Sequence, residues 1–222
     1  MTYTIVIPDL HGMSYLLDAA LKKIEESKLE VSKIVFTGDY IDRGKDSAGV
    51  VNTVKKLVRD GKAIALKGNH EDMMVSSFNI WGDYDESLCP WWITNGGYNT
   101  LASYGFLMEK VSADSLWMKQ LPLYHLDDHR IYVHGYAPVT CKDPDSFWPE
   151  SVMWDRYEKV EDVGWFGRHV VHGHTPRKQP ELLVNRTNLD TRAYETGLLH
   201  VGVFDDSIGG GPVEVWEITG EI

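Results

Sequence analysis

The first third of the chain alternates short apolar runs, rich in β-branched residues, with longer segments of helical periodicity. Three apolar runs predict buried strands and two amphipathic segments predict helices between them, in the order 3–8, 14–28, 33–37, 46–59 and 63–67. Ser14 is expected to cap the first helix, and Asp60 and Gly61 to end the second. This β-α-β-α-β order predicts a partly parallel sheet with right-handed crossovers.

The rest of the chain changes character twice. Residues 70–122 are helical and irregular in pattern and hold Trp81, Trp91, Trp92 and Trp117, which predicts a helical insertion beside the functional edge. Five later segments look extended: Arg130–His134, His169–Val171, Leu182–Asn185, Leu198–Phe204 and Val213–Ile218. We therefore expect an α/β fold of two stacked mixed β-sheets flanked by helices, as a single domain over residues 1–222.

Polar clusters follow directly after five of the predicted strands. They begin at Asp9, Gly38, Gly68, His134 and His172. Since an α/β protein collects such loops at the carboxyl edge of its sheet, the five clusters predict one shared site. Asp, His and Asn side chains are the ligands of hard and borderline metal ions. The candidate ligands are Asp9, His11, Asp39, Asn69, His134 and His174.

Six ligands are too many for one tetrahedral zinc site but suit two ions that share a bridging carboxylate. Asp39 is the expected bridge because it follows the middle strand of the first three. Asp9 and His11 would face one ion, and the remaining three candidates would complete the other. Two divalent ions, two aspartates and one bridging hydroxide leave a net charge of about +1, which attracts a phosphate dianion.

The same clusters supply groups for phosphate chemistry. A metal-bridged hydroxide attacks phosphorus in line, because metals lower the pKa of bound water to roughly 7. His70 lies next to a candidate ligand and is expected to protonate the leaving oxygen, with Asp42 orienting its ring. Arg43 offers a planar fork for phosphate oxygens. Glu71 is expected to support its loop by hydrogen bonding.

Composition and charge narrow the classes of partner. The formal net charge of −11 argues against nucleic acid or an anionic membrane as the main partner, although a metal centre reverses the local sign. Cys89 and Cys141 form no CxxC pair, and no signal peptide or long apolar run is evident. We expect a cytoplasmic protein, monomeric or weakly oligomeric, that acts on a phosphoprotein or a small phosphate ester.

Several motifs resemble those of the phosphoprotein phosphatase family of metallophosphoesterases, and most closely the bacterial and bacteriophage lambda-type Ser/Thr protein phosphatases. They are GDYIDRG at 38–44, GNHE at 68–71, HGHTP at 172–176, and the segments Trp91–Gly105 and Trp154–Arg156. The resemblance implies a calcineurin-like metallophosphoesterase fold and the two-metal roles given above. It also implies that Arg156 joins Arg43 on the phosphate, and that the ions are Mn²⁺, with Fe or Zn as alternatives.

Three positions depart from the family pattern and leave the substrate open. Pro8 and Arg192 each stand where the family usually has Gly. After His134, the chain has Gly135 and Tyr136 where the family usually has Ala and Gly. The main hypothesis is hydrolysis of phosphoserine or phosphothreonine in proteins. The alternative is a hydrolase of dinucleoside polyphosphates, of the symmetric diadenosine tetraphosphate type, or of RNA 5′-end phosphates. A third hypothesis is a catalytically silent metal-binding scaffold.

The remaining histidines are expected to be structural or supporting groups. His174 is preferred to His172 as the ligand, and His172 is expected to play a structural or supporting role. His200 is expected in a core strand. The polar stretch 125–129 is expected to form a solvated loop.

Overall fold

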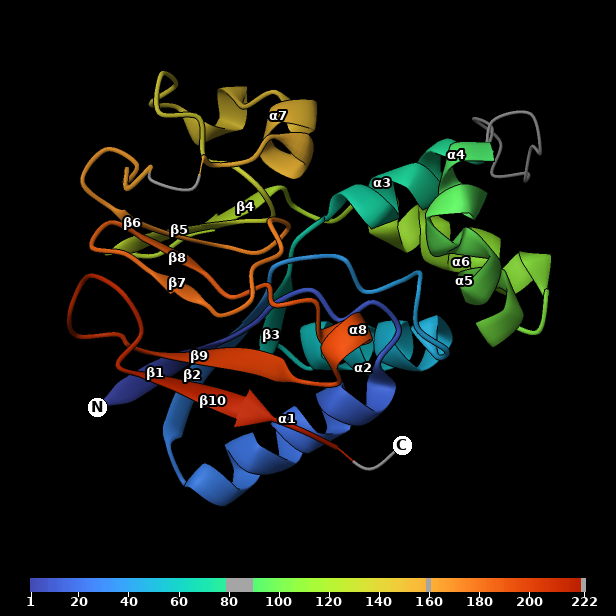
Figure 1. The fold of residues 1–222 in the computed structure, drawn as a ribbon, viewed down its shortest axis with the longest axis horizontal. Coiled ribbons are helices and arrows are strands. Elements are labelled where there is room, and N and C mark those ends of the chain that lie inside the picture. Colours follow the sequence, from blue (N-terminus) through green and yellow to red (C-terminus); the bar gives the residue numbers. More distant parts are fainter. Residues whose placement is uncertain (79–89, 159–160, 221–222) are drawn as a thin grey trace.

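Two five-stranded β-sheets lie face to face in the computed structural model, which describes residues 1–78, 90–158 and 161–220 (Figure 1). The first sheet has the strand order β10-β9-β1-β2-β3. Its strands are β1 (Thr2–Ile7), β2 (Glu30–Phe36), β3 (Ala63–Ala65), β9 (Leu199–Asp205) and β10 (Glu214–Ile218). Strands β1, β2 and β3 are parallel, whereas β9 pairs antiparallel with both β1 and β10, so the sheet is mixed.

The second sheet has the order β4-β5-β6-β8-β7. Its strands are β4 (Tyr124–Leu126), β5 (Arg130–Val133), β6 (His169–His172), β7 (Glu181–Leu182) and β8 (Arg186–Asn188). The three central strands are parallel, whereas β4 and β7 pair antiparallel at the two edges. The predicted α/β architecture of two mixed sheets with helices outside is therefore confirmed.

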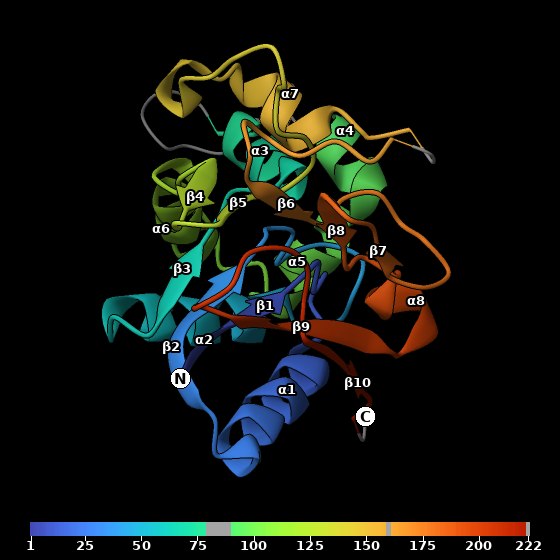
Figure 2. The same ribbon diagram turned by 90° about the vertical axis from the view of Figure 1, so that its left-hand side faces the viewer.

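Side chains that alternate along the strands fill two separate layers. Val6 and Val35 pair in register and pack toward the second sheet, whereas their neighbours Ile5 and Ile34 pack in the core that includes residues of the first two helices. The seven buried residues between the sheets are called the inter-sheet core below: Val6, Val35, Leu66, Tyr132, Val171, Leu189 and Phe204. Figure 2 shows the second sheet stacked above the first.

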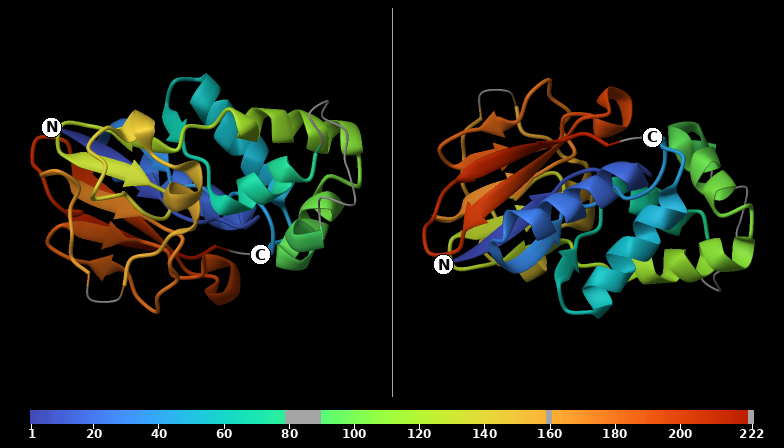
Figure 3. Two further views of the ribbon diagram at one scale, coloured as in Figure 1. Left: turned by 90° about the horizontal axis from the view of Figure 1, so that it is seen from above. Right: turned by 90° about the horizontal axis from the view of Figure 1, so that it is seen from below.

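The helices surround this sandwich on three sides. Their bounds are α1 (Ser14–Ser27), α2 (Ser47–Arg59), α3 (Asn69–Ser76), α4 (Pro90–Trp92), α5 (Tyr98–Ser103), α6 (Met108–Lys119), α7 (Pro149–Trp154) and α8 (Ala193–Thr196). Helices α3 to α6 gather at one end of the molecule, and both views in Figure 3 place them beside the two sheets. A helical segment at Ile93–Gly97, kinked at Gly96 where φ is 110°, joins α4 to α5. Trp81 lies outside the described residues.

Some local predictions were wrong. Ser14 does not cap α1, since Met13 holds the N-cap position without a side-chain bond. The single strand expected at Leu182–Asn185 is a hairpin, in which the backbone N–H of Leu183 bonds to the carbonyl of Arg186 across a turn. In the stretch expected to be a solvated loop, His125 lies in β4, whereas Asp127 and the two residues after it form a turn in which Asp127 accepts from two backbone N–H groups and the Tyr132 hydroxyl. Short α7 and α8 were not predicted.

His169 provides a pH-dependent contribution to stability from outside the candidate site. Its side chain is 4% exposed, its Nδ1 donates to the carbonyl of Val184, and its Nε2 accepts from Thr187 Oγ1. Burial lowers the pKa of His169 to about 4, so this stabilisation is complete above pH 6.5 and is lost as the pH falls toward 4. We expect the free energy of unfolding to lose about 3 kcal/mol from this group over that interval.

The variant His169→Gln isolates this effect. Denaturant unfolding of the metal-free protein between pH 7 and pH 4 should show a steeper loss of stability in the wild type than in the variant. Curves that run parallel across this range would contradict the assignment.

Candidate metal centre

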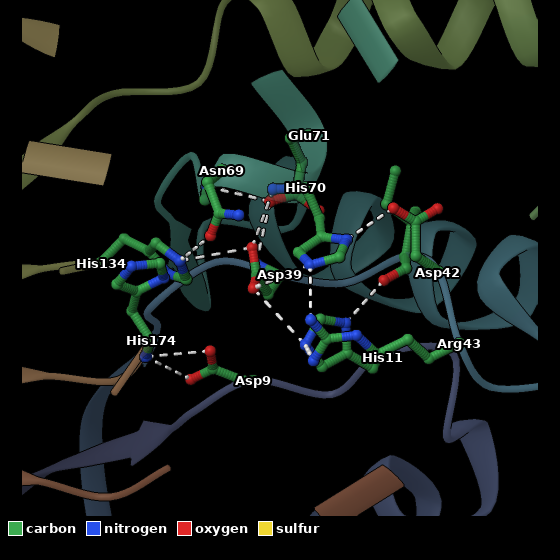
Figure 4. Close-up of polar contacts among 12 residues, drawn as sticks. Asp9, His11, Asp39, Asp42, Arg43, Asn69, His70, Glu71, His134 and His174 are labelled. Atoms are coloured by element: carbon green, nitrogen blue, oxygen red, sulfur yellow. Dashed lines mark hydrogen bonds and ion pairs between the residues drawn. The ribbon is translucent and has the colours of Figure 1, made fainter. Parts of the chain in front are cut away.

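Loops after five strands, β1, β2, β3, β5 and β6, converge on the carboxylate of Asp39 (Figure 4). On one side, the Nε2 atoms of His11 and His70 lie 3.5 and 4.0 Å from Oδ2 of Asp39. On the other, His134 Nε2 lies 3.3 Å from Oδ1, and His174 belongs to the same group. The structure thus forms two groups that share the Asp39 carboxylate, and the first contains His70 where the sequence predicted Asp9, which belongs to neither group.

The tautomers of two histidines follow from their backbone partners. His11 Nδ1 lies 2.9 Å from the carbonyl oxygen of Ile41, and His134 Nδ1 lies 2.8 Å from that of Thr37. A carbonyl only accepts, so each Nδ1 carries the proton. Burial lowers both pKa values well below the usual range, which keeps the rings neutral. Each Nε2 therefore presents a lone pair toward Asp39, the arrangement typical of metal-binding histidines.

Two side-chain oxygens also face the unprotonated ring nitrogen of His134. Asn69 Oδ1 lies 2.9 Å from Nε2 of His134, and Oδ1 of Asp39 lies 3.3 Å from the same nitrogen. All three side chains are at least 95% buried. Buried lone pairs of this kind are costly unless a positive centre binds them, so the donor set fits a divalent cation.

The carboxylate of Asp9 is held in place by the loop that carries His174. Both of its carboxylate oxygens accept from the backbone N–H of His174, at 3.0 and 3.2 Å. Burial, followed by the charge of Asp190, raises the pKa of Asp9 well above its usual range. Burial, followed by Asp9 and Glu71, does the same to Asp39. Several buried carboxyl groups that raise one another's pKa values again favour a bound cation.

Two glycines let these loops approach. A Cβ at Gly173 would lie 1.9 Å from Oδ2 of Asp9, and one at Gly68 would lie 2.2 Å from Oδ1 of Asp39. No side chain fits at such distances, because the nearest atoms belong to the candidate ligands themselves. The requirement for glycine at both positions is therefore steric.

We expect Gly173→Ala to displace Asp9 and to weaken metal binding by about 10–100-fold, the usual effect of disturbing the surroundings of a ligand. Calorimetric titration of the metal-free protein with Mn²⁺ measures this directly. Gly211→Ala is the matched control, since its Cβ would meet Thr187 Oγ1 at an ordinary 3.5 Å. Equal affinities for the two variants would contradict the steric argument.

His70 and Asp42 form a buried pair next to the metal groups. His70 Nδ1 lies 2.6 Å from Oδ2 of Asp42, while Trp92 Nε1 and Thr100 Oγ1 donate to Oδ1 at 2.9 and 2.6 Å. Burial raises the pKa of Asp42 to about 7 and lowers that of His70. Both shifts disfavour charge on a single member, so the two groups share the proton between Nδ1 and Oδ2 and titrate as a pair.

Sequence reasoning missed Trp92 and Thr100 as supports of this pair. Trp92 was predicted only as part of the helical insertion, and Thr100 was not singled out. Both residues lie within Trp91–Gly105, so the motif resemblance already contained the signal.

Two arginines flank the groups. The guanidinium nitrogens of Arg43 lie 3.0 Å from Nε2 of His11 and 3.0 Å from Nε2 of His70. Arginine only donates, so both ring nitrogens act as acceptors here. The cation that these nitrogens contact is the guanidinium group of Arg43. Arg156 Nε lies 3.3 Å from Nε2 of His174. Three of the predicted catalytic residues, Arg43, His70 and Arg156, thus lie beside predicted ligands, and Asp42 lies against His70.

The strand-end loops are backbone-strained. His11, Asp39, Asp42, Arg43 and His174 all have positive φ, between 44° and 73°. Residues other than glycine adopt this region at a cost, and such outliers cluster at functional sites. The strain supports a functional role for these five positions, independently of their side-chain chemistry.

The supporting residues behave largely as expected. Glu71 accepts from three backbone N–H groups, those of Gly68, Asp39 and Tyr40. His172 is buried and bonds through Nε2 to Arg186, which agrees with a structural role.

Two further residues from the sequence analysis, His200 and Tyr136, contact neighbouring side chains. His200 is buried and bonds to Thr191. Tyr136 packs against Tyr157, with ring centroids 4.6 Å apart. Cys141 is free, and Cys89 lies outside the described residues.

Comparison with known proteins identifies the family. The model of the calcineurin-like phosphoesterases matches residues 3–178. The chain belongs to this family. The predicted calcineurin-like metallophosphoesterase fold is confirmed, and the family's divalent-metal chemistry agrees with the two His/Asp groups around Asp39. This phosphoesterase is therefore a metal-dependent hydrolase. Within its described residues, no helix combines the length and apolarity that crossing a membrane requires.

Relatives and solved structures give the range of the similarity. The phosphoesterase is 28% identical to the asymmetrical bis(5′-nucleosyl)-tetraphosphatase PrpE of Anoxybacillus flavithermus, over 84% of each chain. It is 26% identical to serine/threonine-protein phosphatase 1 of Salmonella typhimurium, over 87% of this chain and 88% of the other. A metallophosphoesterase structure from Sphaerobacter thermophilus aligns with a TM-score of 0.64 at 15% identity, covering 99% and 89% of the chains.

Proposed function

We propose that this phosphoesterase hydrolyses bis(5′-nucleosyl) tetraphosphates at a centre of two divalent ions. Mn²⁺ is the ion that we expect the centre to use. The observation that carries the proposal is the pair of acceptor groups that share Asp39, with the Arg43 guanidinium against one of them. Such a centre recognises phosphate by charge. The tetraphosphatase relative, at 28% identity, favours this substrate class over the protein phosphatase hypothesis preferred from the motifs.

The proposed ligands divide between the two sides of Asp39. Asp9 and His11 would hold one ion, and the other would be held by Asn69, His134 and His174, with Asp39 between them. When bound, the two ions would activate a water for attack on phosphorus and neutralise charge on the phosphate oxygens. His11 would first have to release Arg43, because the guanidinium now takes its lone pair.

The other polar residues would handle the phosphate and the proton. Arg43 and Arg156 flank the centre and would hold phosphate oxygens through their planar guanidinium groups. Once Arg43 turns from His70 to the substrate, Nε2 of that ring is free to carry a proton. The ring would then give this proton to the leaving oxygen, while Asp42 holds Nδ1 at 2.6 Å.

A second candidate is a protein serine/threonine phosphatase, and one observation favours it. A serine alkoxide is a poor leaving group that needs a general acid, whereas a nucleotide leaves readily with little proton assistance. The fully built pair of His70 and Asp42, with Trp92 and Thr100 behind it, supplies such an acid. The protein phosphatase relative from Salmonella typhimurium is in line with this candidate.

A substrate panel tests the two candidates. The Mn²⁺-loaded protein is given bis(5′-adenosyl) tetraphosphate, a phosphoserine peptide and a 5′-triphosphate RNA, and the metal content of the same preparation is measured. The proposal expects the highest kcat/KM on the tetraphosphate, with products that distinguish two ADP from ATP plus AMP. A higher kcat/KM on the phosphopeptide would overturn it in favour of the second candidate. The same preparation of Asp39→Asn controls for contaminating phosphatases.

A further inference from the structure

A largely apolar pocket of about 350 Å³ opens beside Arg43. It lies between the loop after β1, the loop after β2 and helix α8, and its lining includes Met13, Tyr15, Lys45 and Tyr194. This volume falls in the range of ~300–1,000 Å³ that is typical of small-molecule sites. None of its aromatic residues has a part in the metal centre or in the proton transfer described above.

The pocket connects directly to the phosphate-binding groups. The guanidinium carbon of Arg43 lies 4.6 Å from the ring centroid of Tyr194, and the same guanidinium reaches His11 and His70. The Tyr194 ring also meets the ring of His11 edge-on, with centroids 5.0 Å apart. A molecule seated on the tyrosines would therefore have its polar end at Arg43, next to the metal groups.

The second tyrosine is held in place by close backbone. A Cβ at Gly220 would lie 2.7 Å from Cδ2 of Tyr15, and one at Gly197 would lie 3.6 Å from its hydroxyl. The ring is thus packed closely against backbone at Gly220, and near backbone at Gly197. A flat aromatic ring that is already ordered loses little entropy when another ring stacks on it.

We infer that this pocket is a subsite for the nucleobase and ribose of a nucleoside phosphate whose 5′-phosphate lies at Arg43. The inference rests on the proposed function, since it names the part of the substrate that the pocket would take. Two tyrosines supply apolar surface for a planar base. Lys45 is an exposed lining residue that can reach the phosphates beyond the first, and the carboxylate of the neighbouring Asp46 accepts from the backbone N–H of Gly49.

The test compares two inhibitors that differ only in the base. Adenosine 5′-monophosphate and ribose 5-phosphate are each titrated against p-nitrophenyl phosphate hydrolysis by the Mn²⁺-loaded protein. Since stacking on an aromatic residue contributes about tenfold in affinity per base, we expect the monophosphate to bind at least about tenfold more tightly. The ratio of the two inhibition constants cancels changes at the metal centre, which affect both inhibitors alike.

Substitutions of the two tyrosines test whether the ratio of inhibition constants depends on the pocket. Tyr194→Ala and Tyr15→Leu should each bring the ratio toward one. Phe166→Ala, an aromatic truncation in the turn before β6, should keep the wild-type ratio. A wild-type ratio near one, or a ratio that neither tyrosine variant changes, would overturn the inference. Calorimetric binding of the two inhibitors gives the same ratio if the aryl phosphate is not turned over.

Failure of this inference is distinct from failure of the proposed function. Turnover of bis(5′-adenosyl) tetraphosphate with a ratio near one would refute the pocket and leave the proposed function standing. A high ratio that depends on the tyrosines, without turnover of the tetraphosphate, would support a nucleoside site and refute the proposed substrate.

Discussion

Asp39→Asn is expected to lower kcat/KM on any phosphate ester by at least about 10³-fold, because both metal groups lose their shared charge and several kcal/mol of catalytic stabilisation. Asp39 is the member common to the two groups, so one substitution removes a ligand from each. Metal analysis of the purified variant should show less than the wild-type content. Full activity with a normal metal content would contradict the bridging role.

Thermal unfolding provides a second readout for this variant. Burial raises the pKa of Asp39, so removing its charge should stabilise the metal-free protein. Metal, by contrast, should stabilise only the wild type, by about 2.7 kcal/mol at a concentration 100 times the dissociation constant. Asp114→Asn is the control, because Asp114 is buried and contacts Tyr104 and Lys55 outside the site. This variant should keep the wild-type metal content.

His70→Asn is expected to lower kcat by about 10²–10⁴-fold on esters with poor leaving groups, since it removes the proposed general acid. The loss should shrink as the leaving group improves, so a series of aryl phosphates is the measurement. A plot of log kcat against the pKa of the released phenol should be steeper for the variant than for the wild type.

Metal content separates this role from direct ligation. His70 Nε2 lies 4.0 Å from Asp39 and belongs to the same group as His11, so the structure also allows it to act as a ligand. A variant with normal metal content and a steeper plot supports the general acid. Loss of metal with an unchanged slope would make His70 a ligand instead.

The sequence predicted the site better than it predicted the chain around it. Asp39, His134 and His174 could be placed together from sequence because each lies within three residues of the end of a strand, and parallel strands end at one edge. Their exact partners could not be predicted. The bond from His174 to Asp9 joins residues 165 positions apart, and nothing local in the sequence encodes it.

The missed elements are those whose conformation depends on tertiary contacts. Helix α8 has only four residues, too few for a helical pattern to appear in the sequence. The hairpin of β7 and β8 has strands of two and three residues, so its turn was indistinguishable from strand. The hydrogen bond from Thr100 to Asp42 joins residues 58 positions apart. It forms only because α5 packs beside the loop that carries Asp42.

The placement of the ligands across two sheets links metal preference to parts of the protein that never touch an ion. Asp9 and Asp39 follow strands of one sheet, and His134 and His174 follow strands of the other, so the spacing between these pairs depends on the inter-sheet core. A larger or smaller side chain at Val171 or Leu189 would shift one sheet relative to the other by fractions of an ångström. Selection for a different ion therefore need not alter any ligand, because repacking the interior is enough to retune the distances between them.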